Sequence, residues 1–242
     1  MPFTFSHPAI VLPLAKISHR YLSVSGLVIG SLTPDFEYFI KMKLSGRFSH
    51  TLTGAFLFDL PVALAILLTF HQVVKKPLID SLPSYFYNRL TALGEFDLLK
   101  ALRENFIPYS LCILVGVFSH IGWDNLTHAN AFFVDRIAFL STPIEIKGLP
   151  VFPLFRYLQH FSTAVGGLYV IFFFHRMKRD SKINTINYYY WLMVASISVF
   201  VLWLRSTYGF EYLGDFVASS ISSFFIGILA VSIAFNFYYQ KR

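Results

Sequence analysis

Residues 52–74 read LTGAFLFDLPVALAILLTFHQVV and carry one charged side chain, Asp59, in an otherwise uncharged and mostly apolar run. Because an α-helix rises about 1.5 Å per residue, this stretch would span about 35 Å, enough to cross the hydrocarbon core of a bilayer, which is about 30 Å thick. Four further runs are comparable and a fifth, diluted by serine and glycine, is weaker: Phe106–Trp123, Phe161–Phe174, Tyr188–Leu204, Phe216–Tyr239 and Leu22–Ile40. The sequence therefore predicts an all-α, polytopic membrane helical bundle with about five to six transmembrane helices.

The composition argues against a soluble protein. Hydrophobic residues make up 55% of the 242 residues and charged residues only 14%, whereas a soluble domain usually carries about 25% charged residues. A soluble all-helical protein is the alternative, but it would have too little polar material to face water. The net charge of +7 is typical of cytoplasmic loops that contact anionic headgroups. We therefore expect membrane lipid as a partner and no nucleic acid.

The chain shows no internal repeat and no boundary for a second domain, so residues 1–242 are predicted to form a single integral membrane domain. Basic clusters near Lys75 and Arg176 assign their loops to the cytoplasm. Basic residues between positions 41 and 47 lie on the opposite, outer side in this scheme and count against it.

Chemically reactive side chains gather at one end of the predicted spans: Asp35, Glu37, His50, His120, Asp124 and His160. None of them was used to assign the loops, and inverting the orientation would keep them together. Ionisable groups in a membrane are costly unless they are paired or bind a ligand. Imidazole and carboxylate donors suit a divalent metal. The sequence therefore predicts a metal site, with zinc as the first candidate and manganese as the second.

The strongest pairs also have simpler explanations. His120 and Asp124 are four positions apart, so they share one helix face. That face suits one metal, or two metals bridged by the carboxylate, but also a hydrogen-bonded surface pair. Asp35 and Glu37 follow Pro34 at a bend, where alternate side chains can point the same way. Asp35 is the preferred ligand and Glu37 a ligand or a base, with a solvated loop pair as the alternative.

Four further histidines are weaker candidates. His50 enters a span, where a ligand and an interfacial histidine give the same pattern. His128 and His160 are lone loop histidines, and a simple loop role is the alternative for each. His7 would reach the site only if residues 8–21 formed a half-helix that dips into the membrane and returns.

Short motifs resemble an uncharacterised family of bacterial integral membrane proteins. They are MPFTFSHPA (1–9), GSLTPDFEY (30–38), SHT (49–51), FDLP (58–61), SHIGWD (119–124) with TH (127–128), and LQHFST (158–163). The resemblance covers about residues 1–175 and leaves 176–242 as two further transmembrane helices. It implies no activity. It does imply a bacterial inner (plasma) membrane, on whose outer face the loop charges would place the site.

A looser resemblance concerns the order N-terminal His, Pro-Asp-x-acid, His-Thr and His-x-x-x-Asp. This order is similar to the membrane-bound metal-dependent hydrolases and to the zinc-dependent phospholipase C and single-strand nuclease superfamily. The likeness implies a zinc cluster with these ligands: Asp35, His50, His120, Asp124, His128 and His160. The chain departs from the superfamily in lacking its N-terminal Trp, for which His7 is the available substitute. It also has Ala164 in place of an acid.

These observations predict a membrane-embedded metal-dependent hydrolase that acts on a phosphoester of a lipid or other amphiphile through a metal-bound hydroxide. Asp35 or Glu37 would orient or deprotonate the water. Arg156 or Arg47 would stabilise charge on the phosphate. The alternative is a non-enzymatic membrane protein, either a metal or proton transporter or a bundle held together by a structural metal.

Overall fold

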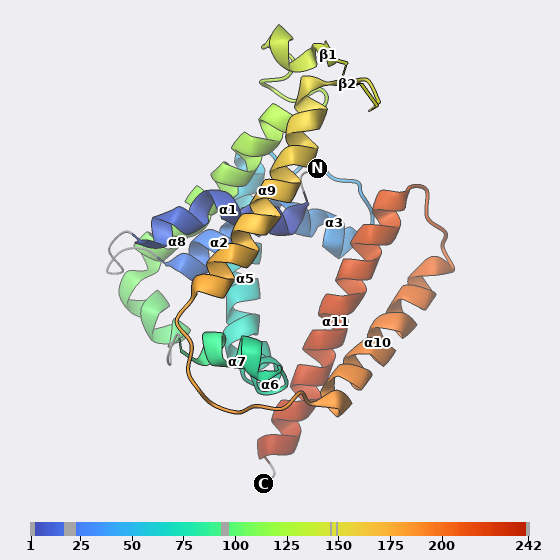
Figure 1. Ribbon diagram of the computed structural model, residues 1–242. Helices are drawn as coiled ribbons and strands as arrows, with labels where there is room; N and C mark the ends of the chain where they lie inside the picture. Colours follow the sequence, from blue (N-terminus) through green and yellow to red (C-terminus); the bar gives the residue numbers. More distant parts are fainter. Residues whose placement is uncertain (1–2, 17–22, 93–96, 146, 149, 241–242) are drawn as a thin grey trace. The chain divides into compact units, whose positions relative to one another are not determined.

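The computed structural model describes residues 3–16, 23–92, 97–145, 147–148 and 150–240. These ranges are helical apart from loops and one short antiparallel hairpin, in which β1 (Pro143–Ile144) pairs with β2 (Phe152–Pro153) (Figure 1). The predicted all-α helical bundle is confirmed.

Within the described ranges, five helices are long and apolar enough to cross a membrane: Leu52–Asp80, Leu98–Thr127, Leu154–Arg176, Tyr188–Ser206 and Leu213–Tyr238. They correspond to the five strong apolar runs of the sequence. The apolar helices are those of a membrane protein, as the composition predicts.

The weak run Leu22–Ile40 is not a continuous helix, and its first residue lies outside the described ranges. Helix α2 (Val24–Leu32) gives way to a 3-10 turn, η3 (Thr33–Asp35), before α3 (Phe36–Lys41) begins. Pro34 explains the interruption, because proline has no N–H to donate and disfavours helical geometry in the residue before it. Helix α2 therefore ends in a turn that carries Asp35.

Contacts between Cα atoms divide the chain into two compact units. Unit one consists of Met1–Asp35, Phe48–Ala63 and Asn105–Arg176. Its remaining elements are η1 (Thr4–Ser6), α1 (Pro8–Val11), η2 (Leu12–Lys16), α4 (Leu52–Gly54), η4 (Ala55–Asp59), most of α8 (Leu98–Thr127), η6 (Ala138–Ser141) and α9 (Leu154–Arg176). The single-domain organisation of the whole chain stays a prediction.

Helix α2 packs closely against α8 within unit one. A Cβ atom on Gly30 would lie 2.1 Å from the carbonyl oxygen of Ile113, and one on Gly116 would lie 2.4 Å from that of Leu27. Both distances are far below van der Waals contact, so only glycine permits this approach of the two backbones. The close packing brings Ser31, at the end of α2, against the last turns of α8.

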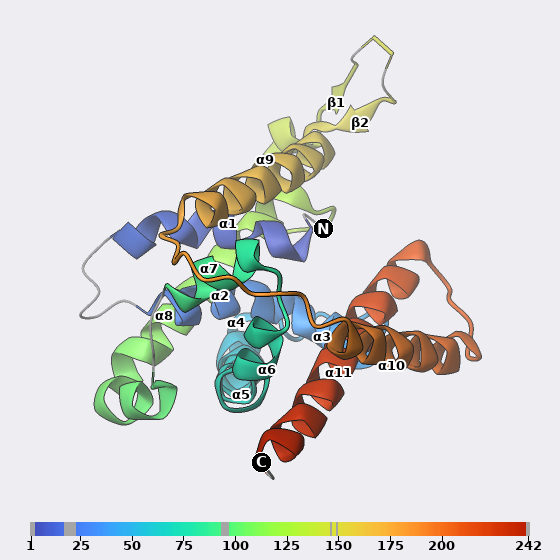
Figure 2. The ribbon, with the colours of Figure 1, turned by 60° about the horizontal axis from the view of Figure 1, so that its bottom comes forward.

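The N-terminal segment packs against α9. The Ser6 hydroxyl donates to the carbonyl oxygen of Thr163 at 2.9 Å, and the backbone N–H of Phe3 donates to the Thr163 hydroxyl at 3.1 Å. The β1–β2 hairpin extends beyond the start of α9 (Figure 2). The short helices around His7 are therefore held beside a long apolar helix.

Unit two consists of Phe36–Arg47, Leu64–Glu104 and Met177–Arg242. It contains α3, most of α5 (Leu60–Thr69), η5 (Phe70–Val74), α6 (Lys75–Asp80), α7 (Ser84–Thr91), α10 (Tyr188–Ser206) and α11 (Leu213–Gln240). Helices α10 and α11 lie side by side in both ribbon views (Figures 1 and 2). Their contact buries Tyr190, whose hydroxyl is 2.9 Å from that of Ser232.

Candidate metal centre

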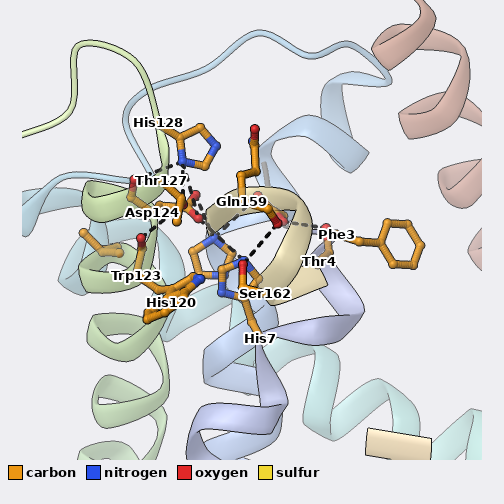
Figure 3. A network of polar contacts seen from close by, with 12 residues as sticks. Phe3, Thr4, His7, His120, Trp123, Asp124, Thr127, His128, Gln159 and Ser162 are labelled. Carbon is orange, nitrogen blue, oxygen red and sulfur yellow. Dashed lines mark hydrogen bonds and ion pairs between the residues drawn. The ribbon is translucent and has the colours of Figure 1, made fainter. Parts of the chain in front are cut away.

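Six of the predicted ligands meet in unit one. His7 precedes α1, Asp35 ends η3, and His50 lies just before α4. His120 and Asp124 are on the last turns of α8, and His128 follows its end (Figure 3). Donor atoms of Asp35, His50 and His120 all lie within 4.8 Å of one another, as do those of His7, His120 and Asp124.

His120 is fully buried at the centre of the group. Its Nδ1 lies 2.8 Å from the carbonyl oxygen of Ser31, so Nδ1 carries a proton and Nε2 is the ring nitrogen that faces the carboxylates. Nε2 is 3.6 Å from Asp35 Oδ1 and 3.5 Å from Asp124 Oδ2. The close packing of α2 on α8 thus sets both the tautomer and the direction of this imidazole.

Asp35 is also fully buried. The Thr4 hydroxyl donates to its Oδ2 at 2.5 Å, which leaves Oδ1 directed at the histidines. His50 Nε2 lies 3.8 Å from Asp35 Oδ1 and 3.5 Å from Asp124 Oδ2. On the other side of the His50 ring, Nδ1 is 3.0 Å from the Ser49 hydroxyl.

These separations test whether the group fits a metal. Distances of 3.5–3.8 Å exceed those of N–H···O hydrogen bonds, which are about 2.7–3.2 Å. Two donors bound at about 2.1 Å to one tetrahedral metal would lie about 3.4 Å apart. His50 Nε2 and His120 Nε2 therefore each lie from Asp35 Oδ1 and from Asp124 Oδ2 at nearly the spacing of two donors on one zinc. We call these four atoms the four-donor set.

The second oxygen of Asp124 faces another pair of histidines. Asp124 Oδ1 is 3.6 Å from His7 Nε2 and 3.7 Å from His128 Nδ1. The rings of His7 and His120 stack with centroids 3.7 Å apart and an interplanar angle of 14°. His128 Nδ1 also lies 3.0 Å from the backbone oxygen of Asp124. Each oxygen of the Asp124 carboxylate thus faces two imidazole rings.

Burial keeps two of these histidines neutral. It lowers the pKa of His7 to about 3, and the adjacent His120 acts in the same direction. Burial also lowers the pKa of His128, although Asp124 opposes the effect. Since only the neutral ring offers a lone pair, both side chains are in the form that binds a metal at neutral pH.

Several buried atoms of the group have no hydrogen-bond partner among the described residues: both ring nitrogens of His7, Asp35 Oδ1, His120 Nε2, Asp124 Oδ1 and His128 Nε2. Buried polar atoms are nearly always hydrogen-bonded, and leaving one without a partner costs about 1–3 kcal/mol. A cation would satisfy lone pairs of both imidazole and carboxylate at once. The residues therefore fit a divalent metal.

Three other predicted residues lie elsewhere. Glu37 belongs to unit two, where its Oε1 accepts from Lys41 Nζ at 2.7 Å. His160 is exposed on the first turns of α9. Arg156 is exposed and lies over the ring of Phe152, 4.4 Å from its centroid. None of the three belongs to either group of converging donor atoms.

Sequence reasoning missed the residues that hold the ligands in place. Thr4 and the carbonyl oxygen of Ser31 orient Asp35 and His120, respectively. A threonine and a backbone carbonyl have no distinctive sequence pattern. The available signal was Gly30 with Gly116, since glycines in apolar helices indicate close helix packing.

Comparisons with known proteins identify a family but no activity. The family model described as "Domain of unknown function (DUF4184)" matches residues 1–233. No curated protein and no solved structure matches the chain significantly. The looser resemblance to metal-dependent hydrolases and to the zinc-dependent phospholipase C superfamily therefore finds no support in the comparisons. The match extends well past residue 175 and covers nearly the whole sequence, so the chain belongs to the DUF4184 family.

Proposed function

We propose that this protein binds a divalent metal, zinc in the first place, and uses it to hydrolyse a phosphoester of a lipid or other amphiphile. The observation that carries the proposal is that both imidazole nitrogens of the four-donor set lie 3.5–3.8 Å from both of its carboxylate oxygens. Two imidazole nitrogens and two carboxylate oxygens are a typical zinc donor set, and manganese accepts the same atoms.

The second oxygen of Asp124 supports catalysis over a purely structural role. Structural zinc sites are closed by four protein donors, whereas catalytic sites keep a position for water or substrate. The four-donor set alone resembles a closed site. Asp124 Oδ1 and His7 Nε2 offer fewer donors, because His128 Nδ1 contacts the backbone oxygen of Asp124 and carries a proton. We place the reacting water and the phosphoester on this side.

The roles of the residues follow from their positions. A bound zinc would lower the pKa of a coordinated water to about 7, which supplies a nucleophile at neutral pH. Asp124 would orient the water through Oδ1, and the neutral His7 ring would accept a hydrogen bond from it. Asp35, fixed by Thr4, would keep its charge directed at the cation. The site adjoins the ends of two candidate membrane spans, Leu52–Asp80 and Leu98–Thr127, which favours an amphiphilic substrate.

The test combines metal content with hydrolysis. The full chain, purified in detergent and loaded with zinc or manganese, is measured by elemental mass spectrometry. It is then assayed with octyl p-nitrophenyl phosphate. His120→Ala should lose both metal and hydrolysis. His175→Ala, at the exposed end of α9, is the matched control and should lose neither.

Two outcomes would change the proposal. Metal that is lost in His120→Ala, without hydrolysis of any phosphoester by the wild type, would leave a structural metal as the function of the site. Equal metal content in wild type, His120→Ala and His175→Ala would remove the site altogether, and with it the proposed hydrolase.

A further inference from the structure

An apolar cavity of about 170 Å³ lies beside His7 in unit one. Its walls come from the N-terminal segment, α8 and α9, and include His7, Ile10, Trp123, Phe161, Val165 and Gly166. Most of these side chains are apolar or aromatic, so the cavity is suited to hydrocarbon rather than to a polar group.

The cavity adjoins the metal-binding residues. His7 forms part of its wall, and the same imidazole lies 3.6 Å from Asp124 Oδ1 through Nε2. Trp123, which also lines the cavity, directly precedes Asp124 in α8. A molecule whose apolar part fills the cavity would therefore have its adjoining polar part at the less crowded oxygen of Asp124.

The cavity reaches the outer surface of α9. Two of its lining residues, Phe161 and Val165, are 66% and 47% exposed. Leu168, one turn further along the same helix, is 67% exposed. Because α9 is a candidate membrane span, this apolar surface would face acyl chains in a bilayer. A chain could pass from the bilayer into the cavity without crossing water.

The volume limits what can bind. An apolar cavity of about 150 Å³ stays dry and accepts a guest the size of benzene. Whole drug-sized ligands need about 300 Å³ or more. A cavity of about 170 Å³ therefore holds a short stretch of hydrocarbon, and the rest of a long chain would remain outside along α9.

We infer that this cavity binds the carbons nearest the headgroup of a hydrocarbon chain, which enters sideways from the bilayer past Phe161 and Val165. The identity of the polar end of that molecule, a phosphoester, rests on the proposed function. Binding of the chain itself requires no metal. The substrate class becomes a single-chain or multi-chain lipid phosphoester rather than a water-soluble one.

The test uses Trp123 as a reporter in the cavity wall. The chain has three tryptophans, so Trp191→Phe and Trp203→Phe leave Trp123 alone. The full chain with these two changes is placed in nanodiscs of saturated phosphatidylcholine, and 1-bromooctane is titrated in. Bromine quenches indole on contact. Cavity binding predicts a saturable quenching component above the linear background from the bilayer.

Variants of α9 separate the cavity from the general lipid surface. Val165→Phe fills the cavity opening and should abolish the saturable component. Ile171→Phe adds the same ring to an exposed position of α9 outside the cavity and should retain it. Ala9, in α1, also lines the cavity. Ala9→Leu fills the cavity from this side, so the result does not depend on one variant folding. Linear quenching alone, or saturable quenching that survives both filling variants, would overturn the inference.

The same preparation distinguishes this inference from the proposed function. Saturable quenching after removal of zinc, without hydrolysis in the loaded protein, would keep the chain-binding cavity and reject the hydrolase. Hydrolysis with the same KM for ethyl and octyl p-nitrophenyl phosphate, without saturable quenching, would keep the hydrolase and reject the cavity as a chain site.

Discussion

Each compact unit contains a buried aspartate, Asp124 in unit one and Asp215 in unit two, and the surroundings of the two carboxylates differ. In unit two, Asp215 Oδ1 accepts from the backbone N–H of Leu44 at 2.8 Å, and its Oδ2 accepts from that of Glu211 at 3.3 Å. In unit one, both oxygens of Asp124 face imidazole nitrogens at 3.5–3.7 Å. The first arrangement is made of hydrogen bonds, and the second is too open for them.

The difference separates a structural carboxylate, Asp215, from a proposed metal ligand, Asp124. Asp215 holds the loop after α3 through backbone donors, and the same loop is fixed by the Ser219 hydroxyl, which donates to the carbonyl oxygen of Met42 at 2.8 Å. Nothing further is required to satisfy Asp215. Asp124 instead faces imidazoles at distances too long for hydrogen bonds, and a cation would interact with its carboxylate and with the neutral His7 ring together.

The largest expected effect comes from Asp124→Asn. The amide keeps the shape of the side chain but removes its negative charge. Because the histidines on both sides of Asp124 face this carboxylate, bound metal should fall to background. Elemental mass spectrometry of the purified protein measures this directly. Asp215→Asn is the matched control and should retain full metal content. Loss of metal in both variants would indicate unfolding rather than removal of a ligand.

A smaller effect is expected from Thr4→Val. The change removes the hydroxyl that donates to Asp35 Oδ2 and preserves the volume of the side chain. Loss of such a supporting hydrogen bond typically lowers metal affinity about 10–100-fold. Competition with a zinc indicator gives the dissociation constant. Thr207→Val, which removes a hydroxyl bonded to Leu204 in unit two, should leave it unchanged. Equal affinities for all three proteins would contradict the role of Thr4.

The sequence predicts the parts of the site that helix geometry alone determines. His120 and Asp124 share a face because four residues make about one turn, and the structure brings their side chains together. Asp35 and His50 join them only through tertiary packing of α2 on α8, which Gly30 and Gly116 permit. The spacing of residues along the sequence does not indicate how closely α2 and α8 pack.

The pairing of Asp35 with Glu37 shows where local reasoning fails. An extended bend would point both carboxylates the same way. The chain instead follows η3 directly into α3, and positions two apart in a helix differ by about 200° around its axis. Asp35 consequently faces the histidines, whereas Glu37 pairs with Lys41. The apolar runs were simpler to interpret, because length and hydropathy alone indicate a membrane span.

Asp215→Asn should lower thermal stability whether or not zinc is bound, whereas Asp124→Asn should change only the stability that zinc adds. Its carboxylate accepts two backbone N–H groups, and an amide can replace only one of these acceptors. The apparent Tm in detergent should fall by several degrees in both the zinc-loaded and the zinc-free protein. Asp124→Asn should instead remove only the increase in Tm that zinc confers. A zinc-dependent loss in Asp215→Asn would erase the distinction between the two units.

The smallest effect is expected from His160→Ala. This variant tests whether the candidate site includes any residue of α9. The looser family resemblance implies that His160 is a ligand, yet the side chain is exposed on α9 and outside both groups of converging donors. Substitution of an exposed residue usually changes stability by no more than about 0.5 kcal/mol. Metal content, zinc affinity and Tm should therefore all match the wild type. A drop in stoichiometry by one metal per chain would mean that the site in unit one extends to α9. In that case a second metal would bind on the side of Asp124 Oδ1, outside the four-donor set.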